Sequence, residues 1–303
     1  MIIYGGKATL KNLFVHNLNW WNFYNNKKAS IRKGIKIAVT KLLSCRNDNV
    51  KGYYKALCYK CGHYHVVRQS CKCKLCSSCG KKATEIWLRK AFKTFPPVGY
   101  HHITLTMPKQ LWELFWLNRD LFSNLMKIAG ETINKYGQNK KQIKLAIYLG
   151  LHTFGSALSK NVHIHLSTSA VGITNDLKQL KNISFDKPSI MKMWRYAVIN
   201  MFRNQFKNNQ LKLPKNLQHL NDYMKFNAWL DALYKKQWII DISKKHDNHS
   251  ITTKYIGKYI KRPAIGDTRI TQFDNAEVQY KFKDHHTNSV TTKSCPKIGR
   301  AHV

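Results

Sequence analysis

Residues 161–168 read Asn161-Val-His163-Ile-His165-Leu-Ser-Thr168 and predict a strand whose two faces differ in character. Successive side chains of a strand point to opposite faces, so His163 and His165 share one face while Ile164 lies on the other. A bulky apolar residue between two histidines indicates that one face packs on a core and the other faces a site. Both imidazoles could then reach one metal ion from a rigid backbone. The alternative is a pair of histidines on a solvated face, the usual meaning of an isolated His-x-His.

The segment that precedes this strand offers a third metal ligand. If 144–153 and 161–168 form a hairpin about a turn near Ala157, His152 lies almost opposite His163. Such a set of imidazoles would leave coordination positions open for substrate oxygens. It would hold Mn²⁺ readily, or Mg²⁺ when phosphate oxygens share the coordination. His152 is therefore the first choice, and the other candidates are His101, His102, Gln142 and Asp241.

A second motif is Tyr255-Ile-Gly-Lys-Tyr-Ile-Lys-Arg-Pro263. In a helix that ends before the proline, Tyr255 and Tyr259 lie one turn apart with Lys258 beside them, and Lys261 and Arg262 follow one turn later. Two phenols next to a cationic cluster suggest covalent chemistry on an electrophile that the cations neutralise, and a phosphodiester fits best. The alternative is an amphipathic helix whose tyrosines pack on a core.

Seven of the eight cysteines fall between residues 45 and 79: Cys45, Cys58, Cys61, Cys71, Cys73, Cys76 and Cys79. Cys58-x-x-Cys61 and Cys76-x-x-Cys79 together supply the four thiolates that structural zinc requires. Cys71 and Cys73 are left over. Either could displace one of the four, join a second site with Cys45 or nearby histidines, or stay unliganded. Because the module is small, we expect it to fold only with metal bound, and the Lys and Arg around it suit a grip on DNA.

The charge of the chain indicates a polyanionic partner. Its 303 residues include 52 Lys and Arg against 15 Asp and Glu, a formal net charge of +37. Nucleic acid is the leading candidate, although AT-rich coding could also raise the Lys content. The sequence has no apolar window of about 20 residues and no signal-peptide pattern, so we expect a cytoplasmic protein that does not bind membranes.

Hydrophobic periodicity predicts the remaining elements, a mixture of helices and short strands. We expect helices at 30–43, 81–94, 109–135 with one break, 189–207 and 218–236, and strands at 100–107, 238–242, 269–273 and 278–282, with a third strand after 283–289. Ser250 is the expected N-cap of the tyrosine helix.

The motifs in this order make the chain resemble the HUH endonucleases. They are the zinc knuckles, His101-His-Ile-Thr-Leu-Thr-Met-Pro108, Leu151-His-Thr-Phe-Gly155, His163-Ile-His165 and Tyr255-x-x-Lys-Tyr259. The chain looks most like the two-tyrosine rolling-circle transposases of bacterial insertion sequences, the insertion-sequence-ninety-one family, from about Cys58 to Thr292. That family usually has another histidine and a proline just before its metal pair, where this chain has Asn161 and Val162.

The resemblance implies an α+β fold. It consists of an HUH-endonuclease palm, an antiparallel sheet flanked by helices, preceded by a small Cys-rich zinc-binding module. The expected division is a basic N-terminal segment at 1–55, a zinc-binding, DNA-contacting module at 56–95, and a nuclease and transposase domain at 96–292. Residues 293–303 are expected to be a truncation or a non-native tail.

The resemblance also implies nicking and rejoining of single-stranded DNA through a 5′-phosphotyrosine. Tyr255 or Tyr259 would attack, and Lys258 would neutralise phosphate or activate the phenol. His163, His165 and His152 would hold Mg²⁺ or Mn²⁺, with zinc in the cysteine module, and Lys261 and Arg262 would bind DNA.

The partners implied are transposon ends and target DNA at the bacterial nucleoid. Two alternatives remain at this point: a plasmid or phage rolling-circle replication initiator, and a zinc-dependent DNA-binding remnant that does not cut.

Overall fold

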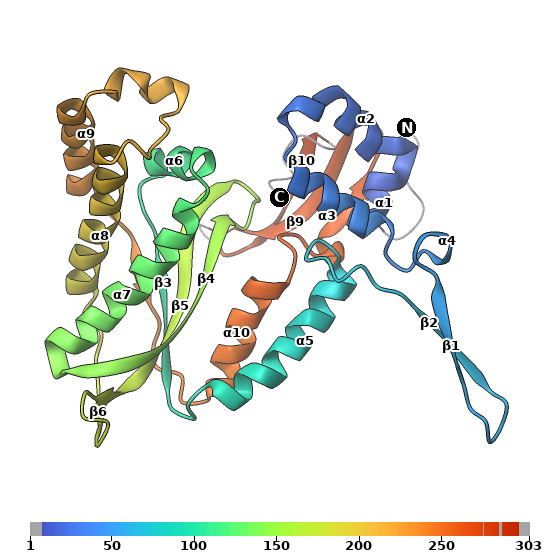
Figure 1. Ribbon diagram of the computed structural model, residues 1–303, viewed down its shortest axis with the longest axis horizontal. Coiled ribbons are helices and arrows are strands. Elements are labelled where there is room, and N and C mark those ends of the chain that lie inside the picture. Colours follow the sequence, from blue (N-terminus) through green and yellow to red (C-terminus); the bar gives the residue numbers. More distant parts are fainter. Residues whose placement is uncertain (1–7, 275, 285–286, 297–303) are drawn as a thin grey trace. The chain divides into compact units, whose positions relative to one another are not determined.

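The computed structural model describes residues 8–274, 276–284 and 287–296, apart from the side chains of Lys258, Tyr259 and Lys261. The chain divides into two compact units (Figure 1). The first comprises Met1–Trp87, Phe154–Ser159 and Lys261–Val303; the second comprises Leu88–Thr153 and Lys160–Ile260. Among the described residues, no helix is both long and apolar enough to cross a membrane.

The second unit is built on a five-stranded sheet. Its strands are β3 (Tyr100–Leu105), β4 (Ile143–Phe154), β5 (Lys160–Thr174), β6 (Leu180–Asn182) and β7 (Ile240–Ile242). They lie in the order β4-β5-β3-β7, with β6 also paired to β5. β3 runs antiparallel to both neighbours, and its register sets Thr104 opposite His165 on β5 and opposite Asp241 on β7. The expected mixture of helices and antiparallel sheet is confirmed.

One face of this sheet carries the core. Alternate residues Ile103, Leu105, Val162, Ile164 and Leu166 are fully buried. They pack against helices that cover this face: α6 (Trp112–Leu117), α7 (Leu121–Lys141), α8 (Lys187–Lys207) and α9 (Tyr223–Lys235), seen together in Figure 1. Burial of each such side chain stabilises the fold by about 1.5–3 kcal/mol. The residues that alternate with them, His163 and His165 among them, therefore occupy the opposite face.

Polar side chains set the helix ends on the core side. The predicted break in the 109–135 helix occurs at Asn118, whose amide donates to Leu114 O and Lys212 O at 2.8 and 2.9 Å. The helix predicted at 218–236 begins later, because the Asp222 carboxylate caps the N–H groups of Met224 and Lys225 and fixes the start of α9. Short 3-10 turns precede these helices at Lys109–Leu111 and Lys215–Leu220.

Helix α10 (His249–Lys261) lies on the other face of the sheet. The expected N-cap was wrong: Ser250 lies inside the helix, and its N–H donates to Asn248 Oδ1 at 2.9 Å. Asn248 caps the helix because a short amide side chain can bond the backbone two residues on. The end of α5 (Ser77–Thr94) contributes Phe92, whose ring contacts His249 edge-on.

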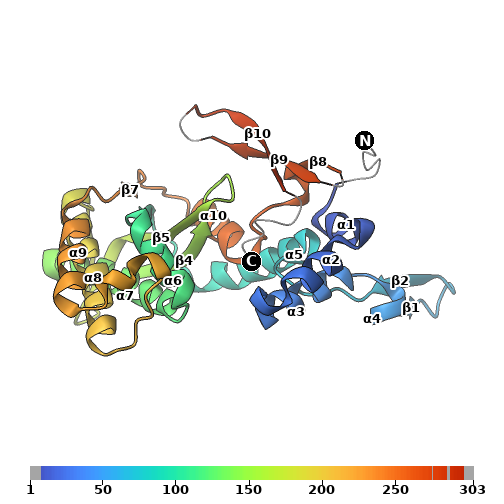
Figure 2. The ribbon, with the colours of Figure 1, turned by 90° about the horizontal axis from the view of Figure 1, so that it is seen from above.

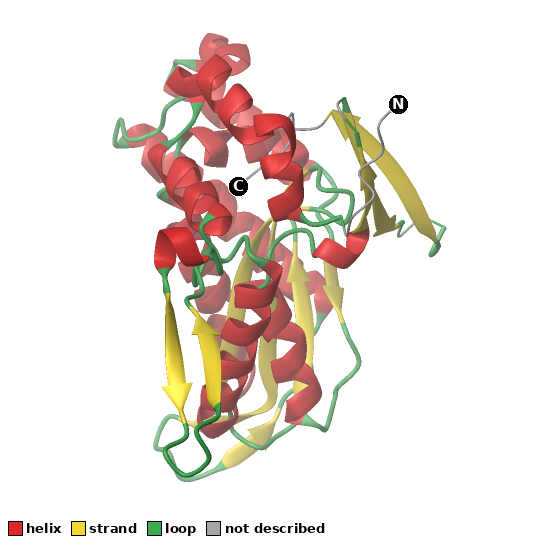
Figure 3. Cartoon of the chain, turned by 90° about the vertical axis from the view of Figure 1, so that its right-hand side faces the viewer, coloured by secondary structure: helices red, strands yellow, loops and turns green. Residues whose placement is uncertain are grey.

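The first unit combines small helices with two further sheets. Its elements are α1 (Leu10–Val15), η1 (His16–Leu18), α2 (Asn19–Lys27), η2 (Lys28–Ser30), α3 (Lys33–Leu43), α4 (Asp48–Lys51), β1 (Tyr53–Leu57), β2 (Tyr64–Arg68), the start of α5, η5 (Asp267–Arg269), β8 (Ile270–Phe273), β9 (Glu277–Lys283) and β10 (Val290–Pro296). β8, β9 and β10 form a three-stranded antiparallel sheet, coloured yellow in Figure 3. Lys293 to Pro296, expected to begin a non-native tail, pair with β9, and 297–303 lie outside the described residues.

β1 and β2 form a separate two-stranded ribbon. Figure 2 shows it extending away from the helices of its own unit. Nearly all of its residues are exposed.

Candidate functional site

Three histidines converge on the sheet face opposite the core. His152 on β4 and His163 and His165 on β5 place their ligand nitrogens within 4.8 Å of one another. The Nε2 atoms of His163 and His165 are 3.1 Å apart, and His152 is only 6% exposed. Two ligands at right angles on a metal ion, each at about 2.1 Å, lie about 3 Å apart, so this spacing fits one ion. The three residues chosen from the sequence are thus brought together.

The other sequence candidates do not join this group. His101 points to the core side, where its ring contacts Phe185 and its Nδ1 bonds Ser243 O at 3.0 Å. Gln142 ends α7 in a left-handed conformation, and Asp241 lies on β7, next to β3. His102 is also outside the group, but its ring packs against that of His165.

Hydrogen bonds set the protonation of the imidazoles. His163 Nδ1 lies 3.0 Å from Asn161 O, which can only accept, so Nδ1 carries the proton and Nε2 keeps its lone pair for a metal. Burial lowers the pKa of His163, and burial together with His152, His163 and His102 lowers the pKa of His165 to about 2. Both rings are therefore neutral at pH 7, which is the ligand form.

Helix α10 brings Tyr255 to the same face. Its ring lies edge-on to His102 with centroids 4.6 Å apart, and 6.3 Å from the His165 ring. Buried Thr252, Thr253 and Ile256 hold the helix, while Tyr255 remains 36% exposed. The side chains of Tyr259, Lys258 and Lys261 lie outside the described residues, and Arg262 is exposed just beyond α10.

Four cysteines converge in the first unit, but they are not the predicted four. Cys45, Cys71, Cys76 and Cys79 place their sulfurs within 4.8 Å of one another. Individual separations are 3.7 Å from Cys45 to Cys76 and to Cys79, and 3.5 Å from Cys71 to Cys79. A tetrahedron with zinc–sulfur bonds of about 2.3 Å has edges of about 3.8 Å, so the set fits zinc.

The predicted ligands Cys58 and Cys61 are exposed at the turn between β1 and β2. The ribbon therefore places them outside the cluster of four sulfurs. Cys45, which follows α3, belongs to that cluster and packs beside Phe14, Trp20 and Leu42. Hydrogen bonds from Cys61, through its backbone and its side chain, lower the pKa of Cys58. Cys73 donates to Ala38 O and stays outside the set.

Burial raises the pKa of Cys76 to about 11. At Cys79 burial acts in the same direction, but hydrogen bonds from Cys71, the Lys72 backbone, Cys45 and Cys76 outweigh it and lower the pKa to about 7. A thiolate held by neighbouring thiols is a suitable first ligand for a metal ion.

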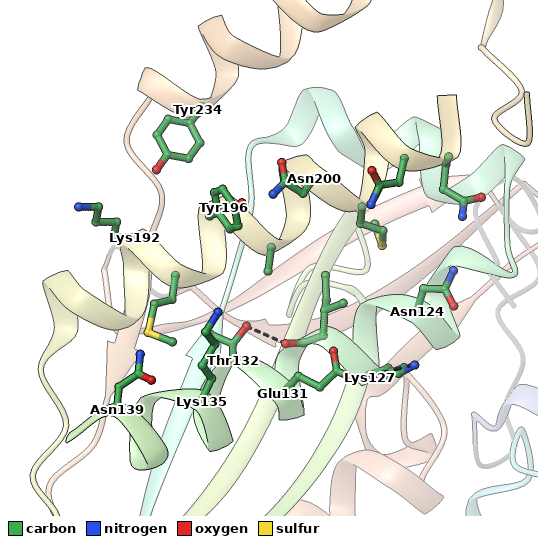
Figure 4. A pocket seen from close by; sticks show the side chains of 16 residues that line it. Asn124, Lys127, Glu131, Thr132, Lys135, Asn139, Lys192, Tyr196, Asn200 and Tyr234 are labelled. Carbon is green, nitrogen blue, oxygen red and sulfur yellow. Dashed lines mark hydrogen bonds and ion pairs between the residues drawn. The ribbon is translucent and has the colours of Figure 1, made fainter. Parts of the chain in front are cut away.

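A cavity of about 730 Å³ lies elsewhere in the second unit, between α7 and α8 (Figure 4). Polar side chains such as Lys127, Glu131, Lys135 and Asn200 line it. None of the site histidines, nor Tyr255, is part of its lining.

Two protein families match the chain. Residues 147–297, which include the three histidines and Tyr255, match the family described as "Putative transposase". Residues 17–107, which include the four converging cysteines, match the "Transposase zinc-binding domain".

Curated relatives cover most of the chain. The transposase for insertion sequence element IS801 of Pseudomonas savastanoi pv. phaseolicola is 31% identical over 283 residues, 92% of this chain and 68% of the relative. "Putative transposase y4qJ" of Sinorhizobium fredii is 22% identical over 269 residues, 86% of this chain and 67% of the relative. No solved structure matches.

Both families are transposase families, so the cysteine cluster and the histidine-bearing sheet belong to a transposase. The chain belongs to the IS91 family of insertion-sequence transposases.

Proposed function

We propose that this transposase nicks and rejoins single-stranded DNA through a 5′-phosphotyrosine intermediate. The observation that carries the proposal is the position of Tyr255, whose ring lies 6.3 Å from that of His165, on the sheet face where three imidazoles converge. A nucleophile beside a metal-binding group is what phosphoryl transfer requires.

The chain's residues have distinct roles in this reaction. His152, His163 and His165 would hold Mg²⁺ or Mn²⁺, which when bound polarises the scissile phosphate and stabilises its developing charge. The Tyr255 phenol gives up its proton and its oxygen attacks phosphorus. The bond from phosphorus to the 3′ oxygen breaks, and that oxygen takes up a proton and leaves as a 3′-hydroxyl.

A later 3′-hydroxyl attacks the phosphotyrosine, which restores a phosphodiester and frees the phenol. The energy of the broken bond is kept in the intermediate.

Tyr259, one helical turn after Tyr255, is the proposed second nucleophile, and Lys258 is proposed to neutralise phosphate or activate the phenol. A second tyrosine permits another cleavage while the first remains bonded to DNA. Lys261 and Arg262 are proposed to bind the DNA backbone.

The zinc-binding module is proposed to contact DNA, with zinc on Cys45, Cys71, Cys76 and Cys79. An isolated two-stranded ribbon is marginally stable in water, which indicates that β1 and β2 act against a partner. The ribbon carries Lys55 and Lys60, and no Asp or Glu occurs between Asp48 and Glu85. Exposed Tyr54 and Tyr59 offer surfaces on which bases can stack.

In domain terms, we propose a DNA-contacting module at 56–95 that shares its zinc with Cys45 of the 1–55 segment, and a nuclease domain at 96–292. The substrates proposed are transposon ends and target DNA in the bacterial cytoplasm, at the nucleoid.

The test is to mix the zinc-loaded protein with labelled single-stranded DNA that carries the element's ends, with and without Mn²⁺, and to look for an adduct that resists SDS. The proposal predicts a Mn²⁺-dependent adduct that His163→Ala with His165→Ala abolishes. His219→Ala, which changes an exposed histidine outside the site, is the matched control. Full cleavage by the double histidine variant would overturn the metal centre.

A further inference from the structure

His102 is a fourth histidine beside the three proposed metal ligands. It lies on β3 and packs its ring against His165, with centroids 5.2 Å apart. Its Nε2 is 3.0 Å from His165 Nδ1, so it contacts the side of the His165 ring that faces away from the cluster. Thr104 Oγ1 is 3.4 Å from each of these two nitrogens.

The other ring nitrogen of His102 is Nδ1. His102 Nδ1 is buried and makes no hydrogen bond within the part of the chain that the structure describes. A buried donor or acceptor without a partner costs about 1–3 kcal/mol.

Without metal, the hydrogen bonds run in one direction. His102 Nε2–H donates to His165 Nδ1, His165 Nε2–H donates to His163 Nε2 at 3.1 Å, and His163 Nδ1–H donates to Asn161 O. Every ring is neutral in this arrangement, and His102 Nδ1 is left with a lone pair. The proton on His165 Nε2 occupies the place where a metal would bind.

Metal binding reverses one of these bonds. His165 Nε2 can ligate only if its proton is on Nδ1, and Nδ1–H then needs an acceptor. The nearest candidate is His102 Nε2 at 3.0 Å, closer than Thr104 Oγ1 at 3.4 Å. To accept, His102 must give up its Nε2 proton and carry a proton on Nδ1 instead. The pair exchanges tautomers and keeps the same number of protons.

We propose that His102 is a positioning residue that accepts the Nδ1–H of His165 and so turns the His165 Nε2 lone pair toward the catalytic ion. The inference rests on the metal centre of the proposed function.

His102 also contacts the proposed nucleophile. In the metal-bound state His102 Nδ1–H is a buried donor, in a ring that contacts Tyr255 at 4.6 Å. That donor has no acceptor among the residues that the structure describes.

The first experiment measures Mn²⁺ affinity of the zinc-loaded protein without DNA, by electron paramagnetic resonance. His102→Leu removes the acceptor at similar volume and should weaken Mn²⁺ binding about 10- to 100-fold. His102→Gln offers an amide oxygen to His165 and should recover most of the affinity. His101→Gln, at the neighbouring position of β3, should bind as wild type does.

Wild-type affinity in a folded His102→Leu variant would overturn the inference while leaving the metal centre in place. Absence of Mn²⁺ binding by the wild type would overturn the metal centre and the inference together.

A second measurement needs no variant. Histidine ¹⁵N spectra of the wild type should show His165 protonated on Nε2 without added metal and on Nδ1 when Zn²⁺ is added as a diamagnetic probe. A His165 ring that keeps its Nε2 proton with Zn²⁺ bound would overturn the inference, even if His102→Leu failed to fold.

Discussion

The ring of Tyr255 stands edge-on against the ring of His102, with centroids 4.6 Å apart and planes inclined at 75°. This contact joins α10 to β3, and β3 is paired to the strand that carries His163 and His165. The tyrosine and the histidine cluster are therefore fixed to one sheet by packing within one unit. If Tyr255 is the nucleophile and the histidines hold the ion, as proposed, the two need little rearrangement to act on the same phosphate.

The cysteine assignment predicts different effects of two substitutions. Cys45→Ser should remove zinc and unfold the small core around Trp20, because structural zinc contributes folding free energy outright. Cys58→Ser should keep its zinc, since Cys58 is exposed and lies outside the set. Metal analysis of the purified proteins checks this, with Cys73→Ser as control. Zinc loss in Cys58→Ser together with retention in Cys45→Ser would contradict the assignment.

The buried histidines predict acid sensitivity when Mg²⁺ and Mn²⁺ are absent. The pKa of His165 falls to about 2 in the folded protein, from an unfolded value of about 6.5. Below about pH 6.5 the unfolded chain therefore binds more protons than the folded protein. The free energy of unfolding then falls as the pH drops, by up to about 1.4 kcal/mol per pH unit for one such group. Urea unfolding at about pH 7 and about pH 5 measures the slope. His165→Gln should flatten it, and a slope that this change leaves untouched would refute the account.

Gly172 on β5 predicts a packing defect. A Cβ at this position would lie 2.7 Å from Ile143 Cδ1 and 2.8 Å from Lys144 O. Because backbone cannot yield easily, Gly172→Ala should destabilise the second unit by about 1–3 kcal/mol. Gly130→Ala in α7, whose Cβ would meet only Leu149 Cδ2 at 3.6 Å, should be neutral or stabilising. Equal unfolding midpoints for the two variants would show that the approach of β4 to Gly172 is not this close.

The ribbon predicts a change in salt dependence. Replacing Lys55 and Lys60 by Ala should weaken binding to single-stranded DNA. It should also make the negative slope of log K against log salt shallower, by about 0.7 for each phosphate that the protein no longer neutralises. The same change at exposed Lys187 and Lys225, on α8 and α9, should leave the slope as it is. Fluorescence anisotropy at several salt concentrations makes the comparison, and identical slopes for the two double variants would exclude the ribbon from the DNA interface.

Local pattern was enough to predict the histidine site. The alternation at 161–168 gives the two faces of β5, and a hairpin turn near Ala157 brings His152 to His163, because strand periodicity and turn position depend on nearby residues. The spacing of Tyr255 and Tyr259 likewise predicted α10, although Asn248 rather than Ser250 caps this helix.

Long-range packing decided what local pattern left open. The packing of α3 against the Cys71–Cys79 stretch decides which cysteines meet. The only sequence signal for Cys45 is its position just after an amphipathic helix. The contact of His102 with His165 depends on the register of β3 on β5, strands some sixty positions apart in sequence. His102 could be named only as one of several candidate ligands.

The most direct test of the account is the covalent adduct itself. Zinc-loaded wild type, Tyr255→Phe with Tyr259→Phe, and the control Tyr196→Phe, which alters an exposed tyrosine on α8, are each incubated with labelled single-stranded element ends and Mn²⁺ and then denatured in SDS. The account predicts an adduct in the wild type and in the control, and none in the double variant, with DNA binding equal in all three. An adduct that persists in the double variant would contradict the assignment of the nucleophile.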